Sequence, residues 1–179
     1  MRLIERMLPV VDTVEGILRR VSEAIVVITV VVLLAALGVN VAMRYAFEQG
    51  GISWLSELPE HLFPWMVAAG VVLAALQGAH IAVDILLDVI SERAAGILAV
   101  LIQLLIAVAY VVLAVVAVNV AQIASIEMSS LLRLPRSWGY YALVYMSVGV
   151  TVASLVVALR IAHGGRGAVA GLSAEESPL

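Results

Sequence analysis

Long stretches without charged side chains dominate the hydrophobic pattern of this chain. Four stretches contain no Asp, Glu, Lys or Arg, and they occupy residues 24–43, 62–79, 94–126 and 137–159. A helix crosses the hydrocarbon core of a bilayer with about 20 apolar residues, because each residue rises about 1.5 Å. In lipid the backbone must satisfy its own hydrogen bonds, so these stretches are expected to be helices. The pattern predicts an all-α membrane protein with four transmembrane helices, at about 24–44, 58–79, 94–122 and 137–161.

The segment 1–22 has a different, two-sided pattern. Its apolar residues are spaced alternately by four and three, while charged residues occupy the other positions; the apolar set is Leu3, Met7, Val10, Val14, Ile17 and Val21. This periodicity predicts an amphipathic N-terminal helix that is bent or begins near Pro9. Such a helix lies on the membrane surface or packs on a partner subunit, and one apolar stripe fits both cases.

The connection between the second and third spans also has a helical period. His80, Asp84, Asp88 and Glu92 recur at every fourth residue and would share one face of a helix. We therefore expect a short interfacial helix over 80–93. The tail 164–179 is rich in Gly, Ala and Ser and is expected to be disordered, which leaves 23–163 as the four-helix transmembrane domain.

Composition supports lipid as part of the solvent. Of the 179 residues, 64% are hydrophobic and 13% are charged, whereas about a quarter of the residues of a soluble domain are charged. The net charge of −3 provides no basic face, so nucleic acid is not an expected partner. The absence of Cys excludes disulfides, thiolate metal sites and thiol catalysis.

The distribution of Arg predicts the orientation. The first apolar run begins behind a charged segment and is too long for the core of a signal peptide, so we expect it to be a retained first span. Seven Arg residues lie in the N-terminal segment, the second loop and the region after the fourth span, while Arg44, Arg133 and Arg136 lie on the other side. The positive-inside rule then places both termini in the cytoplasm.

Three motifs between Asn40 and Asp84 carry a family resemblance. The first is Asn40-Val-Ala-Met-Arg44-Tyr45-Ala-Phe47, and the second runs from Trp54-Leu-Ser-Glu57-Leu58 through Leu62-Phe63-Pro64-Trp65 to Gly70. The third is His80-Ile81-Ala-Val83-Asp84. In order and spacing they resemble the small, four-span membrane subunit (Q or DctQ type) of tripartite ATP-independent periplasmic (TRAP) transporters. Together the motifs cover about a quarter of the chain, and the four-span layout extends the match.

The resemblance implies a role in assembly. In TRAP systems a large membrane subunit carries the substrate and sodium sites, and a periplasmic binding protein delivers an organic acid. The small subunit would scaffold the large one in the bacterial inner membrane and help dock the binding protein, without a cofactor of its own. The expected fold or interface positions are Asn40, Arg44, Tyr45, Glu57, Trp65, Gly70, His80 and Asp84.

Physical arguments apply to several of these residues independently. Arg44 closes the first span and Glu57 opens the second, so the two side chains could form an ion pair; alternatively Arg44 extends alone to water. Trp54, Trp65 and Trp138 are candidate interfacial anchors, and Trp65 is deep enough to pack on a neighbouring helix. Gly70 and Gly149 suit close helix approach.

Other chemistry has little support in the sequence. Glu57 with His61 and His80 with Asp84 are pairs spaced by four, but the two pairs lie at opposite ends of the second span, roughly 28 Å apart. Haem would need two axial His at matching depth, and the chain has three His in all. No nucleophile–base constellation or phosphate-binding motif is present, so enzymatic activity is not expected. The alternatives are a stand-alone redox or metal-binding membrane module and the small subunit of a tripartite tricarboxylate transporter.

Overall fold

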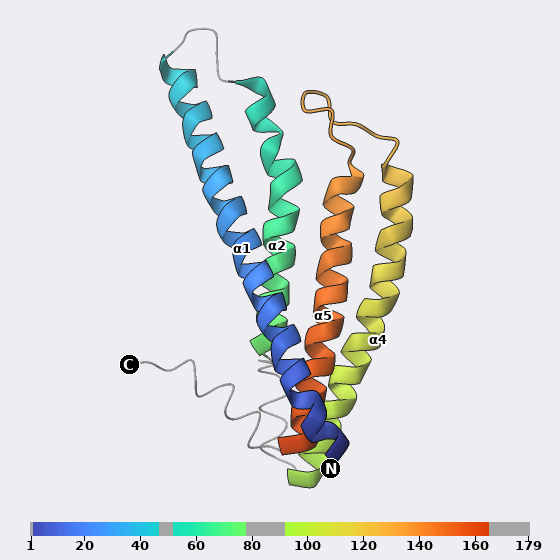
Figure 1. The fold of residues 1–179 in the computed structure, drawn as a ribbon. Helices are drawn as coiled ribbons and strands as arrows, with labels where there is room; N and C mark the ends of the chain where they lie inside the picture. The colour runs from blue at the N-terminus through green and yellow to red at the C-terminus, as the bar shows by residue number, and fades with distance from the viewer. Residues whose placement is uncertain (1, 47–51, 78–91, 165–179) are drawn as a thin grey trace, which may run out of the picture.

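The described part of the chain consists of long helices. The structure, a computed structural model, describes residues 2–46, 52–77 and 92–164. Its helices are α1 (Arg2–Ala46), α2 (Leu58–Gln77), α4 (Glu92–Ala124) and α5 (Ser137–Gly164), with a short 3-10 helix, η1 (Ser53–Ser56), before α2 (Figure 1). All four α-helices are long and apolar enough to cross a membrane, which confirms the predicted fold class.

The helices pack in the spatial order α1, α2, α5, α4. Helix α1 packs on α2, α2 on α5, and α5 on α4 (Figure 1). The N-terminal half of α1 also crosses α5, where Ser22 contacts Tyr145. Half of the α5 span is consequently buried, against 17% of the α1 and α4 spans. Helix α5 is therefore the central element, and most of α1 and α4 is available to lipid or to other proteins.

Helix α1 continues through residue 22, where the sequence divided the amphipathic N-terminal helix from the transmembrane domain. It runs for 45 residues without a break, so the N-terminal amphipathic segment continues the first span. Pro9 lies within the helix. Proline lacks an N–H and so removes one hydrogen bond of the helix there, and no Gly or Pro stands between Gly16 and Gly38 to end the helix.

The face of α1 that packs inside the chain is not the apolar stripe of the sequence. Val11, Glu15, Ser22 and Thr29 are buried, whereas Val10, Val14, Ile17 and Val21 of the stripe are exposed, Val10 by 62% and Ile17 by 59%. The stripe is therefore free to contact lipid or another protein, and both alternatives from the sequence stay open.

The closest helix approach joins α2 and α5. Val72, Leu76, Val150 and Ala153 form a buried cluster between these helices. A Cβ atom added to Gly149 would lie 2.5 Å from Val72 Cγ2, so only glycine fits there. The predicted close approach at Gly149 is confirmed. At Gly70 an added Cβ would meet nothing within 4 Å, so no close approach occurs there between the described helices, and an approach to a partner helix stays a prediction.

Two predicted elements fall outside the described residues. They are the interfacial helix of 80–93, except for its last two residues, which begin α4, and the tail after Gly164. His80 and Asp84 lie in the first of these segments, so their predicted roles remain predictions.

Candidate functional site

Polar contacts gather at the two ends of the helix layer. One group lies where α2 and α5 begin, and the other lies where α1 begins and α5 ends. Between them, buried hydroxyl groups bond mainly within their own helices: Thr29 donates to Ile25 O at 2.6 Å and Ser147 to Leu143 O at 2.8 Å. Apart from the Ser22–Tyr145 bond between α1 and α5, the described side-chain contacts between separate elements lie at these two ends.

Glu57 joins the start of α2 to the loop between α4 and α5. The backbone N–H of Leu132 donates to Glu57 Oε2 at 2.9 Å, and that of Leu131 donates to both carboxylate oxygens at 3.0 and 3.1 Å. We call this contact the Glu57 clamp. It satisfies two backbone donors of a loop that is distant in sequence, and so fixes where the loop lies.

The loop itself is a short hairpin over residues 127–136. Ser129 N donates to Leu134 O and Arg136 N donates to Glu127 O, both at 2.9 Å. The side chains of Arg136 and Glu127 form an ion pair at 3.5 Å. At its turn Arg133 has φ 53°, in the left-handed region that a non-glycine residue rarely adopts. Internal bonds of this kind, together with the Glu57 clamp, hold the turn in one conformation.

The Glu57 clamp bears on the two alternatives that the sequence left open for Arg44, an ion pair with Glu57 or extension alone to water. Within the described residues no ion pair joins these two side chains, and Arg44 is exposed on the last turn of α1. The backbone donors of the hairpin take the place of the guanidinium. Sequence spacing could not predict this, since the donors follow Glu57 by more than seventy residues.

Glu57 immediately precedes α2, which begins at Leu58. Both of its carboxylate oxygens accept hydrogen bonds from backbone N–H groups, so the ionised carboxylate is the form that holds the hairpin.

His61 does not form the metal pair that its spacing suggested. It is buried, and its Nδ1 lies 3.1 Å from the backbone oxygen of Glu57 rather than beside the carboxylate. Among the described residues no group of three or more His, Asp or Glu could hold a metal ion. The ring instead covers the first turn of α2.

Trp65 packs on α5, as its depth in the span predicted. Its ring lies 5.3 Å from that of Trp138 and 6.0 Å from that of Tyr145, both tilted. Its Nε1 is buried without a hydrogen-bond partner in the described chain, as is Oδ1 of Asn40 on α1. Trp65 is thus a packing residue between α2 and α5, whereas Tyr45 at the end of α1 is 89% exposed.

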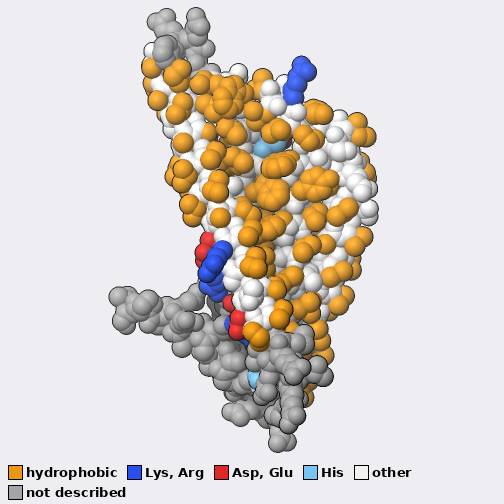
Figure 2. All heavy atoms as spheres, in the orientation of Figure 1, with side chains coloured by type: hydrophobic (Ala, Val, Ile, Leu, Met, Phe, Trp, Pro, Cys, Tyr) orange, Lys and Arg blue, Asp and Glu red, His pale blue; other side chains and the backbone are white. Residues whose placement is uncertain are grey.

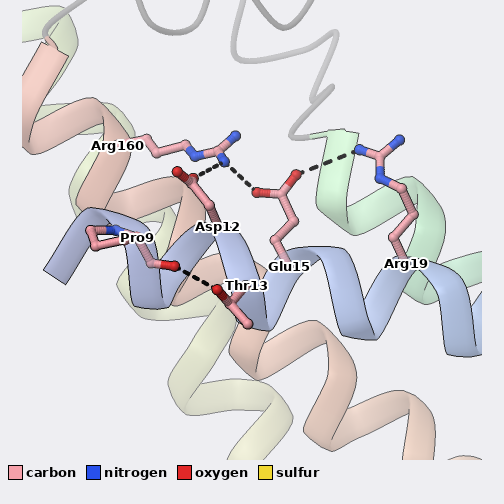
Figure 3. A network of polar contacts seen from close by, with 6 residues as sticks. All are labelled: Pro9, Asp12, Thr13, Glu15, Arg19 and Arg160. Carbon is pink, nitrogen blue, oxygen red and sulfur yellow. Dashed lines mark hydrogen bonds and ion pairs between the residues drawn. The ribbon is translucent and has the colours of Figure 1, made fainter.

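An ionic cluster ties α1 to the end of α5 (Figure 3). Arg160 Nη2 donates to Asp12 Oδ1 at 2.8 Å and lies 2.6 Å from Glu15 Oε2. The second contact is a charge pair without aligned hydrogen-bond geometry. Glu15 Oε1 also faces Arg19 at 3.5 Å. We call these four residues the Arg160 cluster; it balances two acids with two bases.

Sequence reasoning missed the Arg160 cluster and the nearby Ser22–Tyr145 bond of 2.7 Å. One feature of the sequence pointed to this contact. Glu15 and Ser22 are seven residues apart, so they share one side of a helix, and neither belongs to the apolar stripe. Nothing in the sequence, however, shows that this polar face is the one that meets α5.

The exterior agrees with a protein that lies in lipid. Figure 2 shows hydrophobic side chains over most of the visible face, with the acidic side chains gathered in its lower part. Exposed aliphatic residues line α4, among them Ile97, Leu105 and Val108. Fold and surface together define a polytopic membrane protein whose described charged contacts lie toward the ends of its helices.

Comparison with known proteins identifies the family. Residues 33–164 match the family of tripartite ATP-independent periplasmic transporters, DctQ component. The chain belongs to this family, which confirms the resemblance of the Asn40–Asp84 motifs. It is also 23% identical over 131 residues to a putative TRAP transporter small permease protein of Haemophilus influenzae, covering 73% of this chain and 79% of that protein.

A second relative is much longer. The protein y4mM of Sinorhizobium fredii is 40% identical over 140 residues, which are 78% of this chain and 26% of the relative. The chain thus spans about a quarter of that protein's length and about four fifths of the Haemophilus relative.

Proposed function

We propose that this protein is the small permease subunit of a TRAP transporter and acts as a scaffold. It would hold a large membrane subunit and help dock a periplasmic binding protein during sodium-coupled uptake of an organic acid. In this proposal it lies in a bacterial inner membrane with both termini in the cytoplasm. The observation that carries the proposal is the DctQ family match over 33–164.

The interior of the spans favours a scaffold over a transport path. Substrate and ion paths usually carry ionisable residues or interrupted helices near the bilayer centre. The four predicted spans have no charged residue in their middles, and the hydroxyls of Thr29, Ser147 and Thr151 donate to carbonyls of their own helices. This leaves few groups to bind an ion or a carboxylate substrate.

The arrangement of the helices supports the same role. The helices form a single row in the spatial order α1, α2, α5, α4. Because α1 and α4 lie at the two ends of this row, most of the surface of each stays exposed. Such a layer can lie against a larger membrane protein and cover it from lipid. Among the candidate positions, Glu57, Trp65 and Asn40 are proposed to maintain the fold, and Arg44, Tyr45, Gly70, His80 and Asp84 to form the subunit interface.

Co-purification tests the proposal most directly. The tagged chain is expressed in its own host, extracted in mild detergent, and its partners are identified. A stoichiometric large polytopic membrane protein is the expected result, and omission of the chain should abolish binding-protein-dependent uptake driven by a sodium gradient in liposomes. Recovery of the chain alone under several mild detergents would reject the subunit role, and absorbance and metal content would then test the stand-alone module.

A further inference from the structure

The hairpin between α4 and α5 exposes large apolar side chains. Ile126 is 84% exposed, Met128 61%, Leu131 48% and Leu134 38%. Residues of this kind are unfavourable in water when they cluster on one short loop. The cluster adjoins Ile123 on the last turn of α4, which is 72% exposed, so the apolar exterior of α4 continues onto the hairpin.

The hairpin extends beyond the ends of α4 and α5 to the level at which α2 begins (Figure 1). Its turn is tied through Leu131 and Leu132 to Glu57, the residue before α2. Its base is joined to α5 by the bond from Trp138 N to Pro135 O at 3.0 Å. Figure 1 shows this loop reaching from the α4–α5 side toward the start of α2.

The same level is marked by aromatic residues. The large exposed aromatic side chains of the described chain all belong to this end of the layer: Tyr45, Trp54, Phe63, Trp138, Tyr140 and Tyr141. Trp and Tyr concentrate where bilayer headgroups meet acyl chains. The opposite end carries the Arg160 cluster instead. The hairpin therefore lies at the depth of an aromatic belt.

The hydrogen bonding of the hairpin suits a region with little water. The N–H groups of Ser129 and Arg136 are bonded to carbonyls within the loop, and Leu134 N donates to Ser129 Oγ at 3.2 Å. The Glu57 carboxylate accepts from Leu131 and Leu132. Backbone donors that enter the boundary of a bilayer must be satisfied in this way, because an unpaired one is costly there.

We propose that the hairpin inserts its apolar side chains into the headgroup–acyl boundary of the bilayer and anchors this end of the helix layer to lipid. The occupant of the apolar surface is thus lipid, and the Glu57 clamp holds the hairpin at the required depth. Arg133 and Arg136 can extend from the same loop to lipid phosphates. This anchor is independent of the proposed transport role.

Because the chain contains no cysteine, a single introduced cysteine can be labelled at one known position. Single variants Ile126→Cys, Met128→Cys and Leu131→Cys are labelled with a bimane fluorophore in the full-length chain and reconstituted in liposomes containing nitroxide-labelled lipid. Ser130→Cys, an exposed polar position in the same hairpin, is the matched control. We expect strong quenching at the three apolar positions and weak quenching at Ser130. Equal quenching at the apolar and control positions would overturn the proposal.

A second measurement separates lipid from a protein partner. The same variants are exposed to a membrane-impermeant maleimide in native membranes, with and without the co-purifying large membrane protein. Reaction at Met128→Cys should be about tenfold slower than at Ser130→Cys in both cases, because a thiol inserted among lipid chains loses contact with water and forms little reactive thiolate. Protection that disappears when the large protein is absent would show a protein surface instead, and would overturn insertion into lipid.

Discussion

The carboxylate of Glu57 lies 2.9 Å from the backbone nitrogen of Leu132, 75 residues later in the chain. This single contact joins the start of the second span to the loop that connects the last two spans. At the other end of the layer, Arg160 joins the end of the last span to the beginning of the first. The two contacts act on different helices and can be tested separately.

Substitution of Glu57 should loosen the hairpin without unfolding the helices. In Glu57→Gln the N–H donors of Leu131 and Leu132 lose a charged acceptor, so their amide exchange should accelerate several-fold. Glu60→Gln, an exposed acid three residues later, is the matched control and should have no effect. Exchange at these amides that is unchanged in Glu57→Gln would reject the clamp.

The Arg160 cluster should depend more on Glu15 than on Asp12. The Glu15 side chain is 11% exposed and that of Asp12 is 62% exposed, so solvent screens the second pair more. Arg160→Gln should lower the free energy of unfolding by about 1–3 kcal/mol, because the partly buried Glu15 carboxylate loses a partner. Asp12→Asn should cost less than about 1 kcal/mol.

A double-mutant cycle between Arg160→Gln and Glu15→Gln checks this assignment. The apparent melting temperature in detergent, monitored by helical circular dichroism, would be measured for the unsubstituted chain, for each single variant and for the double variant. Additive effects of the two substitutions would show that the pair contributes no coupling.

The α2–α5 contact should not tolerate a methyl group at Gly149. The added Cβ would meet Val72 Cγ2 at 2.5 Å, so Gly149→Ala should destabilise the chain by about 1–3 kcal/mol. Combination with Val72→Ala should restore part of the loss, since the clashing atom is removed. Gly70→Ala is the control, because an added Cβ there meets nothing within 4 Å in this chain; equal losses in the two glycine variants would argue against the close approach.

The Ser22–Tyr145 bond links α1 to α5 in the middle of the layer. Ser22 is fully buried. Tyr145→Phe should therefore lower the free energy of unfolding by about 1 kcal/mol, because the buried Ser22 hydroxyl loses its Tyr145 partner. Tyr141→Phe alters an exposed ring on the same helix and should be neutral. The melting temperatures of the two variants, measured side by side, check this expectation. Equal melting temperatures would show that the Ser22–Tyr145 bond does not stabilise the chain.

The proposed interface can be tested at two positions from the family motifs. Arg44→Ala and Asp84→Ala should each lower the yield of the complex with the large membrane protein, and uptake should fall in proportion. Normal uptake and normal complex yield in both variants would remove these residues from the interface.

The number, approximate position and helical character of the four spans followed from sequence, because the cost of burying charge and unpaired backbone groups in lipid acts on each segment separately. The packing of Trp65 also followed, since ring size and depth in a span are local properties. The sequence offered Gly70 and Gly149 as equal candidates for close approach, and the structure shows the approach at Gly149. The family motifs from Asn40 to Gly70 likewise lie in one short segment.

Contacts between distant segments could not be predicted from the sequence. The sequence offered Glu57 as one possible partner of Arg44, yet the backbone of Leu131 and Leu132 occupies that carboxylate. The apolar stripe of residues 10–21 is visible in sequence, but the polar face with Glu15 and Ser22 is the one that packs on α5. Hydrophobic periodicity specifies which faces of a helix are apolar. Which face meets a neighbour depends on the crossing of α1 over α5 and on the pairing of buried charges, and these exist only once the helices have come together.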